Sequence, residues 1–265
     1  MFTKIRKFIS FPFSKKMEVF HTLLTDRLVF AISAILFNRY SLTYLPDSFI
    51  AGRYPHHYSL YNKFRKFNKK NNGGDLNRLI SMMLNIENIF NEKNVEGDFA
   101  ELGVWRGNTA QVLAYYAKKY ERKCYLFDTF EGFHANDLKG PDSQYKTEVF
   151  SDTSINLVKE VIGEDYLLNC EFVPGYFPAS ALPNLENKIF SVVSLDADLY
   201  APTKAGLEYF FPLMGNGGLF LLHDYSSGCW DGCKRAIDEF CDKENQFLVL
   251  MPDKSGSAFI RVQKT

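Results

Sequence analysis

Residues 99–110 read Phe-Ala-Glu-Leu-Gly-Val-Trp-Arg-Gly-Asn-Thr-Ala, an apolar run that meets two glycines before helix-forming residues begin. The pattern predicts a strand near 98–103, a turn at Gly103 and Gly107, and a helix near 108–120. In this arrangement the free N–H groups of the helix N-terminus bind small anionic or nucleoside-bearing ligands. The stretch therefore predicts a ligand site at the end of its strand.

A second apolar run, residues 123–128, ends in Asp128. A doubly wound fold places a carboxylate about twenty residues after its glycine turn, where it binds ribose hydroxyls. Gly103 and Gly107 are spaced too widely for the dinucleotide fingerprint, which disfavours a pyrophosphate. Glu101 would repel a phosphate but attract an amino group or a sulfonium. S-adenosylmethionine carries both groups and is the expected cofactor; the alternative is an ordinary strand–turn–helix with an exposed glutamate.

The composition of the chain fits one globular core without a broad charged surface. The 265 residues are 46% hydrophobic, and 31 basic residues balance 31 acidic ones, for a formal net charge of +0. A formal net charge of zero does not indicate the broad, positively charged surface that binds nucleic acid, so we expect no nucleic-acid partner. The five cysteines form no pair of CxxC motifs, and their odd number argues against a complete set of intrachain disulfides. We therefore expect a reducing, cytoplasmic location.

The N-terminal part of the chain differs from the rest. Residues 1–74 are rich in aromatic and basic side chains, and we expect them to form helices and loops outside the main sheet, as a lid or an arm between subunits. The apolar run Leu28–Phe37 is shorter than the ~20 residues that cross a bilayer, and no signal peptide is evident. We expect this part to pack on the domain or on a second subunit. Binding to an anionic membrane surface is the less favoured alternative.

Residues 75–265 alternate between predicted strands and helices, and we assign them to one domain. Asp75 is the expected N-cap of a helix that extends to Phe90. Further helices are predicted near 153–162, 202–212 and 231–243, and further strands near 169–174, 189–196, 217–223, 247–251 and 257–262. This alternation implies a mostly parallel seven-stranded sheet with helices on both faces, whose ligands bind beyond the carboxyl ends of the strands.

Two of the predicted strands end in carboxylates. Asp196 and Asp198 follow one strand, and His223 and Asp224 follow the next. If these strands are neighbours, their ends lie about 5 Å apart, and Asp196 and Asp224 converge on one cation. Oxygen ligands suit magnesium or manganese, whereas imidazole suits zinc, copper or iron, so His223 is either a further ligand or a base. The alternatives are aspartates that only cap the next helix and a structural, hydrogen-bonded His223.

Several motifs occur in series along the chain. They are Glu101-Leu-Gly-Val-Trp-Arg-Gly107, Phe127-Asp-Thr-Phe-Glu-Gly132, Leu195-Asp-Ala-Asp-Leu-Tyr200 and His223-Asp-Tyr225, followed by Gly232-Cys-Lys-Arg-Ala-Ile-Asp-Glu-Phe240. This series resembles the macrocin O-methyltransferase family over about residues 75–262. The resemblance implies a Rossmann-like class I methyltransferase fold and a homo-oligomer. It also implies methylation of a sugar hydroxyl with S-adenosylmethionine and a divalent metal, commonly magnesium.

The resemblance implies roles for single residues around the cofactor. It places Glu101 and Gly103 at the methionine part of S-adenosylmethionine and Asp128 at the ribose. Ser154 and Gly175 would lie near the adenine. The acceptor would be a small molecule or a glycan: a sugar in a glycoside, a polysaccharide or a natural product.

The resemblance also implies roles around the metal. Asp196 and Asp224 match metal ligands, and Asp198 matches the general base. His223 departs from the pattern, because members that act on antibiotic sugars tend to have a second aspartate there. His223 is therefore expected as the third metal ligand or as a catalytic group, and the metal is expected to be Mg²⁺ or Mn²⁺.

Three other functions remain open from the sequence. A non-catalytic assembly protein that binds S-adenosylmethionine is one, because His223 replaces a carboxylate. A nicotinamide-dependent dehydrogenase is disfavoured by the glycine spacing and by the metal-like acidic cluster. Methylation of a catechol or of another vicinal diol would use the same metal geometry.

Overall fold

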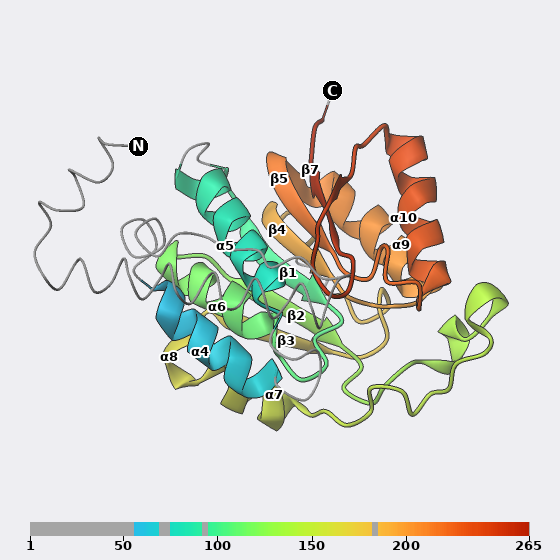
Figure 1. Cartoon of the computed structure of the whole chain (residues 1–265), viewed down its shortest axis with the longest axis horizontal. Helices are drawn as coiled ribbons and strands as arrows, with labels where there is room; N and C mark the ends of the chain where they lie inside the picture. Colours follow the sequence, from blue (N-terminus) through green and yellow to red (C-terminus); the bar gives the residue numbers. More distant parts are fainter. Residues whose placement is uncertain (1–55, 69–74, 92–94, 182–184, 265) are drawn as a thin grey trace, which may run out of the picture. The chain divides into compact units, whose positions relative to one another are not determined.

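The structure is a computed structural model that describes residues 56–68, 75–91, 95–181 and 185–264 (Figure 1). Residues 56–265 form one compact unit. The expectations for residues 1–55, including binding to a membrane surface, lie outside the described residues, and the domain boundary at residue 74 stays a prediction. No helix in the described ranges is long and apolar enough to cross a bilayer.

Seven strands form one sheet in the order β3-β2-β1-β4-β5-β7-β6. Strands β1 to β5 run parallel, while β7 runs antiparallel to both β5 and β6. The strands are β1 (Asp98–Leu102), β2 (Cys124–Asp128), β3 (Cys170–Pro174), β4 (Phe190–Leu195), β5 (Met214–Leu222), β6 (Val249–Leu250) and β7 (Ala258–Arg261). The predicted fold is confirmed. Its strand order reverses between β1 and β4, which is where doubly wound sheets bind their ligands.

Helices cover both faces of the sheet (Figure 1). On one face α5 and α6 pack against strands and contact α4, while on the other α9 packs on β4 and against α10. The helices are α4 (His57–Asn68), α5 (Leu76–Asn91), α6 (Ala110–Lys119), α7 (Ile155–Ile162), α8 (Glu164–Leu167), α9 (Tyr200–Phe210) and α10 (Asp231–Glu244). Short 3-10 turns η1 (Ala135–Asp137), η2 (Gly140–Asp142) and η4 (Phe211–Leu213) complete the described elements.

The largest differences from the predicted boundaries are at β5 and β6. Strand β5 begins at Met214, before its glycines, because Met214 still pairs with Phe190 across a register shift in β4. Strand β6 has only two residues, since only Val249 and Leu250 pair with β7 at the outer edge of the sheet. Side chains at this edge are exposed, including those of Phe247, Val249 and Leu250.

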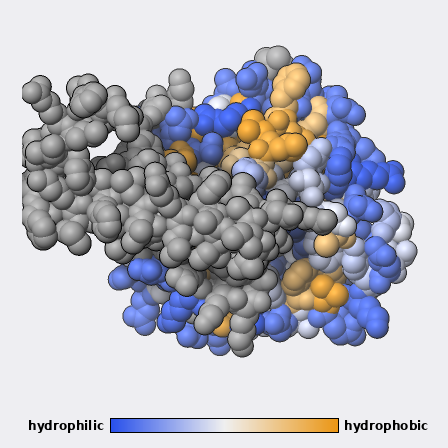
Figure 2. All heavy atoms as spheres, in the orientation of Figure 1, coloured by the Kyte–Doolittle hydropathy of each residue, from blue (hydrophilic) through white to orange (hydrophobic). Residues whose placement is uncertain are grey.

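The core lies between the sheet and its helices. Phe99, Phe127, Phe190 and Phe220 from the central strands are fully buried. All six residues of β4 are buried, as expected of a parallel strand covered on both faces. On the face drawn in Figure 2, the coloured hydrophobic residues form patches among hydrophilic ones. Burial on both faces leaves only the strand ends free to present polar groups.

Gly103 brings the end of β1 against the end of β4. It has φ +87°, and a Cβ there would overlap the carbonyl oxygen of Asp196. Asp196 in turn donates its N–H to the carbonyl oxygen of Leu102 at 2.9 Å. Only glycine combines this conformation with so close an approach of two backbones.

Gly103→Ala is expected to lower the free energy of unfolding by roughly 3 kcal/mol, because it adds a backbone clash to an unfavourable φ. Gly140→Ala is the matched control. Gly140 also has a positive φ, +58°, but no described atom lies within 4 Å of its added Cβ. Urea unfolding measures the free energy of unfolding of both variants. An equal decrease in both would show that the close approach of the two backbones at Gly103 does not destabilise the alanine variant.

Glu87 joins α5 to α6 and to the residue before α4. Its Oε1 lies 3.1 Å from Nε2 of His56 and 2.5 Å from Nζ of Lys119, and its Oε2 accepts from the hydroxyl of Tyr120 at 2.9 Å. Burial raises the pKa of Glu87, but the hydrogen bonds from these three groups outweigh burial and lower that pKa to about 2. The ionised carboxylate therefore stabilises the folded chain.

We expect Glu87→Gln to reduce the loss of stability in acid. A carboxyl group whose pKa falls on folding stabilises fully above its unfolded pKa, and that contribution disappears as the pH falls from about 5 to about 2. Urea unfolding between these pH values should show a shallower decline for Glu87→Gln than for the wild type. The exposed Glu208→Gln is the control and should follow the wild-type curve. A variant curve parallel to the wild type would contradict the role of Glu87.

Candidate functional site

A cavity of about 330 Å³ opens at the carboxyl ends of β1, β2, β4 and β5. This is the position where open α/β sheets bind their ligands. Its wall includes seven of the residues predicted from the sequence: Gly103, Asp128, Gly175, Asp196, Asp198, His223 and Asp224. Strands β4 and β5 are neighbours, as the convergence of Asp196 and Asp224 required.

The side chain of Asp128 makes hydrogen bonds to the loop after β1 and to the loop after β2, beside the cavity. Its Oδ2 accepts from the backbone N–H groups of Val104 and Trp105, at 2.7 and 2.8 Å, and its Oδ1 accepts from that of Phe130 at 2.6 Å. The carbonyl oxygen of Asp128 accepts from the N–H of Gly175 at 2.9 Å. The side chain therefore shapes the glycine turn and still lines the cavity.

Glu101 and Ser154 are not among the described residues that line the cavity. Glu101 is 1% exposed within β1, and its Oε2 has no hydrogen-bond partner among the described residues. Burial, and then the nearby Asp196, raise its pKa well above the usual range. Ser154 caps α7, where its Oγ accepts from the N–H of Leu157 at 3.2 Å. The cofactor contacts assigned to these two residues stay predictions.

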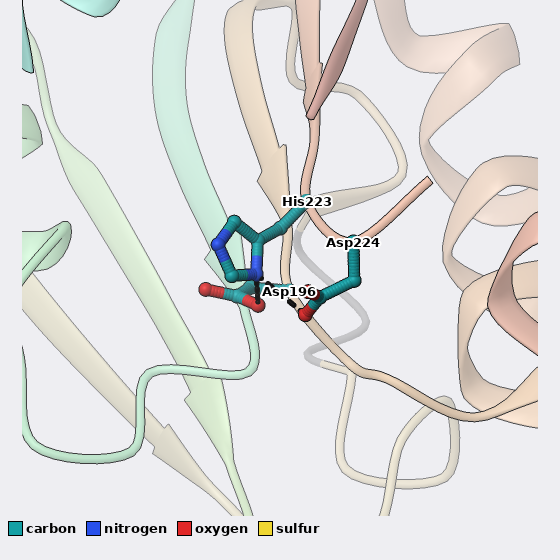
Figure 3. Close-up of side chains that lie close together, drawn as sticks. All are labelled: Asp196, His223 and Asp224. Carbon is teal, nitrogen blue, oxygen red and sulfur yellow. Dashed lines mark ion pairs between the residues drawn. The ribbon is translucent and has the colours of Figure 1, made fainter. Parts of the chain in front are cut away.

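Asp196, His223 and Asp224 converge at the ends of β4 and β5 (Figure 3). Nδ1 of His223 lies 2.5 Å from Oδ1 of Asp196 and 2.7 Å from Oδ2 of Asp224. Neither contact is aligned as a hydrogen bond. One potential ligand atom from each residue lies within 4.8 Å of the others, and two carboxylates with one imidazole are a donor set that divalent ions use. The residues therefore fit a divalent cation.

The charges of this cluster shift its pKa values in opposite directions. Burial raises the pKa of Asp196, but His223 and Arg78 outweigh burial and hold it well below its usual range. Burial and Arg78 lower the pKa of His223, but the carboxylates of Asp196 and Asp224 outweigh them and raise it to about 9. Near neutral pH this shift favours the charged imidazolium form of His223 beside these carboxylates.

Asp198 lies beside this cluster and is 7% exposed. Burial, and then the carboxylates of Asp196 and Asp224, raise its pKa well above its usual range. Leu199 takes the N-cap position of α9 and its own side chain makes no cap bond, so Asp198 is not the helix cap that was its structural alternative. A buried carboxyl group with a raised pKa is the type of group that serves as a general base.

Arg78 is a site residue that the sequence analysis missed. It lies in the first turn of α5, where its N–H donates to the predicted cap Asp75 at 3.2 Å. Its Nη2 donates to Oδ2 of Asp196 and to Oγ1 of Thr109, both at 2.8 Å, and its Nη1 lies 2.8 Å from Nε2 of His223. The only local signal was a basic residue within the apolar pattern of this helix.

Aromatic side chains line the cavity as well. Phe133, Phe150 and Trp230 contact one another, with ring centroids 5.5 to 6.0 Å apart. Asp142, in the same loop as Phe133, accepts at 2.7 Å from the N–H of Tyr200 at the start of α9. This apolar wall could not be predicted from the sequence, because its rings come from separate segments.

The sequence profile of the family described as "Macrocin-O-methyltransferase (TylF)" matches residues 74–251. Among curated proteins, mycinamicin III 3''-O-methyltransferase of Micromonospora griseorubida is 29% identical over 161 residues, which are 56% of this chain and 62% of the relative. Demethyldecarbamoylnovobiocin O-methyltransferase of Streptomyces niveus is 28% identical over 157 residues, 56% of this chain and 59% of the relative. The chain thus spans about three fifths of the length of these relatives.

Two solved methyltransferase structures also superpose on this chain. The O-methyltransferase NovP superposes with a TM-score of 0.59 at 25% sequence identity, over 71% of this chain and 81% of NovP. The calicheamicin methyltransferase CalS11 superposes with a TM-score of 0.57 at 25% identity, over 70% of this chain and 79% of CalS11.

Proposed function

The chain belongs to the macrocin-O-methyltransferase family, and from that premise we propose that it methylates a sugar hydroxyl with S-adenosylmethionine as the methyl donor. One observation carries the proposal. Asp196, Asp198 and Asp224 lie in the same cavity as Gly103 and Asp128, so one ligand site holds both the acidic cluster and the glycine turn. A further curated relative, from Streptomyces olivaceus, is named 8-demethyl-8-(2,3-dimethoxy-alpha-L-rhamnosyl)-tetracenomycin-C 4'-O-methyltransferase. The rhamnosyl group in that name supports a sugar in a glycoside, a polysaccharide or a natural product as the acceptor.

S-adenosylmethionine supplies a methyl group made electrophilic by its sulfonium. Asp128 would bind a ribose hydroxyl with the lone pair of Oδ1 that its three backbone contacts leave free, and Gly175 would lie against the adenine. Glu101 has an unpaired, buried oxygen, and an ammonium group is the partner that would offset its desolvation. We propose that these residues would hold the donor at the end of the sheet.

Asp196 and Asp224 would hold a divalent ion, Mg²⁺ or Mn²⁺, with His223 as a third donor. Such an ion lowers the pKa of a hydroxyl group that binds to it. Asp198 would then take the hydroxyl proton as the oxygen attacks the methyl group, because its carboxyl group lines the cavity together with Asp196 and Asp224. The aromatic wall and the strand ends would keep the acceptor at near-attack distance, which is where most of the rate enhancement originates.

Asp128→Ala tests the cofactor site. We expect it to weaken S-adenosylhomocysteine binding by about 10² or more, because it removes both the ribose partner and two bonds that shape the turn. Isothermal titration calorimetry measures the affinity, and the exposed Asp165→Ala on α8 is the control. Wild-type affinity in Asp128→Ala would place the nucleoside elsewhere.

A methyl-transfer assay tests the reaction. Radiolabelled S-adenosylmethionine with a panel of glycosides, nucleotide sugars and catechols should label a sugar acceptor. Label in a catechol alone would favour the vicinal-diol alternative. S-adenosylhomocysteine binding without any labelled acceptor would favour a non-catalytic binding protein. The homo-oligomer and the cytoplasmic location stay predictions, and light scattering tests the first.

A further inference from the structure

The loop between β2 and α7, residues 129–154, provides two rings of the aromatic wall. Phe133 and Phe150 both come from this loop, and both line the cavity together with Trp230. The loop contains only the three-residue turns η1 and η2 as regular elements, and none of its residues belongs to the sheet. Its position therefore depends on contacts with the elements beside it.

Gly132 brings the two ends of this loop together. It has φ +95°, and a Cβ there would lie 2.3 Å from the carbonyl oxygen of Thr147 and 2.7 Å from that of Val149. This close approach places Phe133 beside Phe150, with ring centroids 5.5 Å apart. The residues between the two ends reach the helices, where η1 contacts α9 and η2 contacts α10 (Figure 1).

Asp142 joins this loop to both helices. It lies in η2 and is only 1% exposed. Its Oδ2 accepts at 2.7 Å from the N–H of Tyr200, in the first turn of α9. A Cβ built on Gly232, in the first turn of α10, would lie 2.4 Å from Oδ1 and 2.6 Å from Oδ2 of Asp142. One carboxylate therefore lies against the first turns of two helices, where free N–H groups and the helix dipole favour negative charge.

This contact lies outside the cavity, because Asp142 is not among the described residues that line it. Its Oδ1 is buried and has no hydrogen-bond partner among the described residues, and a buried carboxyl oxygen without a partner is destabilising. Burial of Asp142 therefore lowers stability by itself. The bond that it makes in return joins the loop to α9.

We propose that Asp142 is a positioning residue, which holds the loop against α9 and α10 and so keeps Phe133 and Phe150 in the acceptor-binding wall. Helix α9 has independent support, because it packs on β4 and against α10. The loop does not have support of this kind, so loss of the contact displaces the loop rather than the helix. Asp198, which precedes α9, should then stay in place. The inference rests on the proposed function only where it assigns the wall to the acceptor.

Two further hydrogen bonds reach this loop. The hydroxyl of Tyr145 donates to the carbonyl oxygen of Cys229 at 2.5 Å, and the hydroxyl of Tyr176 donates to Oδ1 of Asp137 at 2.8 Å. Both remain when Asp142 is replaced. We therefore expect Asp142→Ala to loosen the loop without unfolding the domain.

Hydrogen–deuterium exchange of the whole chain, followed by mass spectrometry, tests the contact without any ligand. The amides of Tyr145 and Val149 donate to carbonyl oxygens within the loop, so their exchange reports its opening. Asp142→Ala should raise their exchange rates by about tenfold or more and leave those of α9 at the wild-type value. Glu148→Ala removes an exposed carboxylate from the same loop and should change neither set of rates.

Gly232→Ala disturbs the same contact from the side of α10. Alanine favours a helix more than glycine does, so α10 itself should not weaken. The added Cβ would overlap the carboxylate of Asp142 and displace it, because that side chain is able to rotate away. Exchange in the loop should therefore rise as in Asp142→Ala. In the Asp142→Ala background the same substitution should add less than about twofold, because the carboxylate is already gone.

Kinetics separate positioning from a purely structural role. With the acceptor that the methyl-transfer assay labels, Asp142→Ala should raise the acceptor KM by about tenfold. Both kcat and the affinity for S-adenosylhomocysteine should stay within about threefold of the wild type. Asp142→Asn retains an oxygen for the N–H of Tyr200, so it should restore most of the acceptor affinity.

Wild-type exchange of Tyr145 and Val149 in both Asp142→Ala and Gly232→Ala would overturn the proposal, and additive increases in the double variant would contradict it. An unchanged acceptor KM in Asp142→Ala would also overturn it, because the wall would then not depend on the contact. If Asp142→Ala does not fold, both measurements use Gly232→Ala, with the same expected results. Failure to label any acceptor would instead reject the proposed function, and the exchange rates would still test the contact.

Discussion

Asp198→Asn is expected to lower kcat by about 10² to 10⁴-fold, which is the usual contribution of a positioned general base. The carboxyl group is buried and lines the cavity together with Asp196 and Asp224, so the wild-type side chain is placed to take a hydroxyl proton. Asparagine keeps the size and the polar contacts but accepts no proton. S-adenosylhomocysteine affinity should remain at the wild-type value.

Steady-state kinetics at saturating donor and acceptor measure this effect. Asp137→Asn is the matched control, because Asp137 also lines the cavity as a buried carboxyl group but bonds to the hydroxyl of Tyr176 at 2.8 Å. The control should keep kcat within about tenfold of the wild type. An equal loss in both variants, or full kcat in Asp198→Asn, would remove Asp198 from the proton transfer.

Asp224→Ala is expected to lower kcat/KM by about 10³-fold and to abolish Mn²⁺ binding. The variant removes one metal ligand, and without the ion the transition state would lose several kcal/mol of charge stabilisation. Asp224 also provides one of the two carboxylate oxygens around Nδ1 of His223, so the variant frees that side of the ring. The nucleoside would lie at Asp128, at the end of β2, and strands β1 and β4 separate β2 from β5. S-adenosylhomocysteine binding should therefore persist.

Kinetics and calorimetry on the same protein sample separate these two effects. Asp231→Ala, at the exposed start of α10, is the control and should change neither quantity. Undiminished turnover in Asp224→Ala would reject the metal role. Loss of both turnover and S-adenosylhomocysteine binding would show instead that the cavity has collapsed.

The fold could be predicted because its central strands are buried on both faces. Strands β1 and β4 are mostly apolar and buried almost throughout, and they are followed by a glycine turn and by Asp196, so each strand and its polar end are visible in the sequence. The convergence of Asp196 and Asp224 needed only that β4 and β5 be neighbours. Strand β6 was predicted too long because local apolar content does not report how far an edge strand is paired.

Arg78 could not be predicted by the same means. It lies 118 residues from Asp196 and 145 from His223, and no periodicity links such distant positions. Asp142 was missed for the same reason, since its partner Tyr200 is 58 residues away. Contacts of this kind depend on how loops and helix ends meet above the sheet. The residues that hold a site in place are therefore harder to find than those that end its strands.

The central claim is that the methyl donor and a divalent cation share the cavity at the carboxyl ends of β1, β2, β4 and β5. A crystal structure with S-adenosylhomocysteine and Mn²⁺, with anomalous data collected for manganese, tests it most directly. The account predicts the ribose against Asp128 and an anomalous peak between Asp196 and Asp224. A nucleoside bound outside this cavity, or no anomalous peak at these two carboxylates, would contradict it.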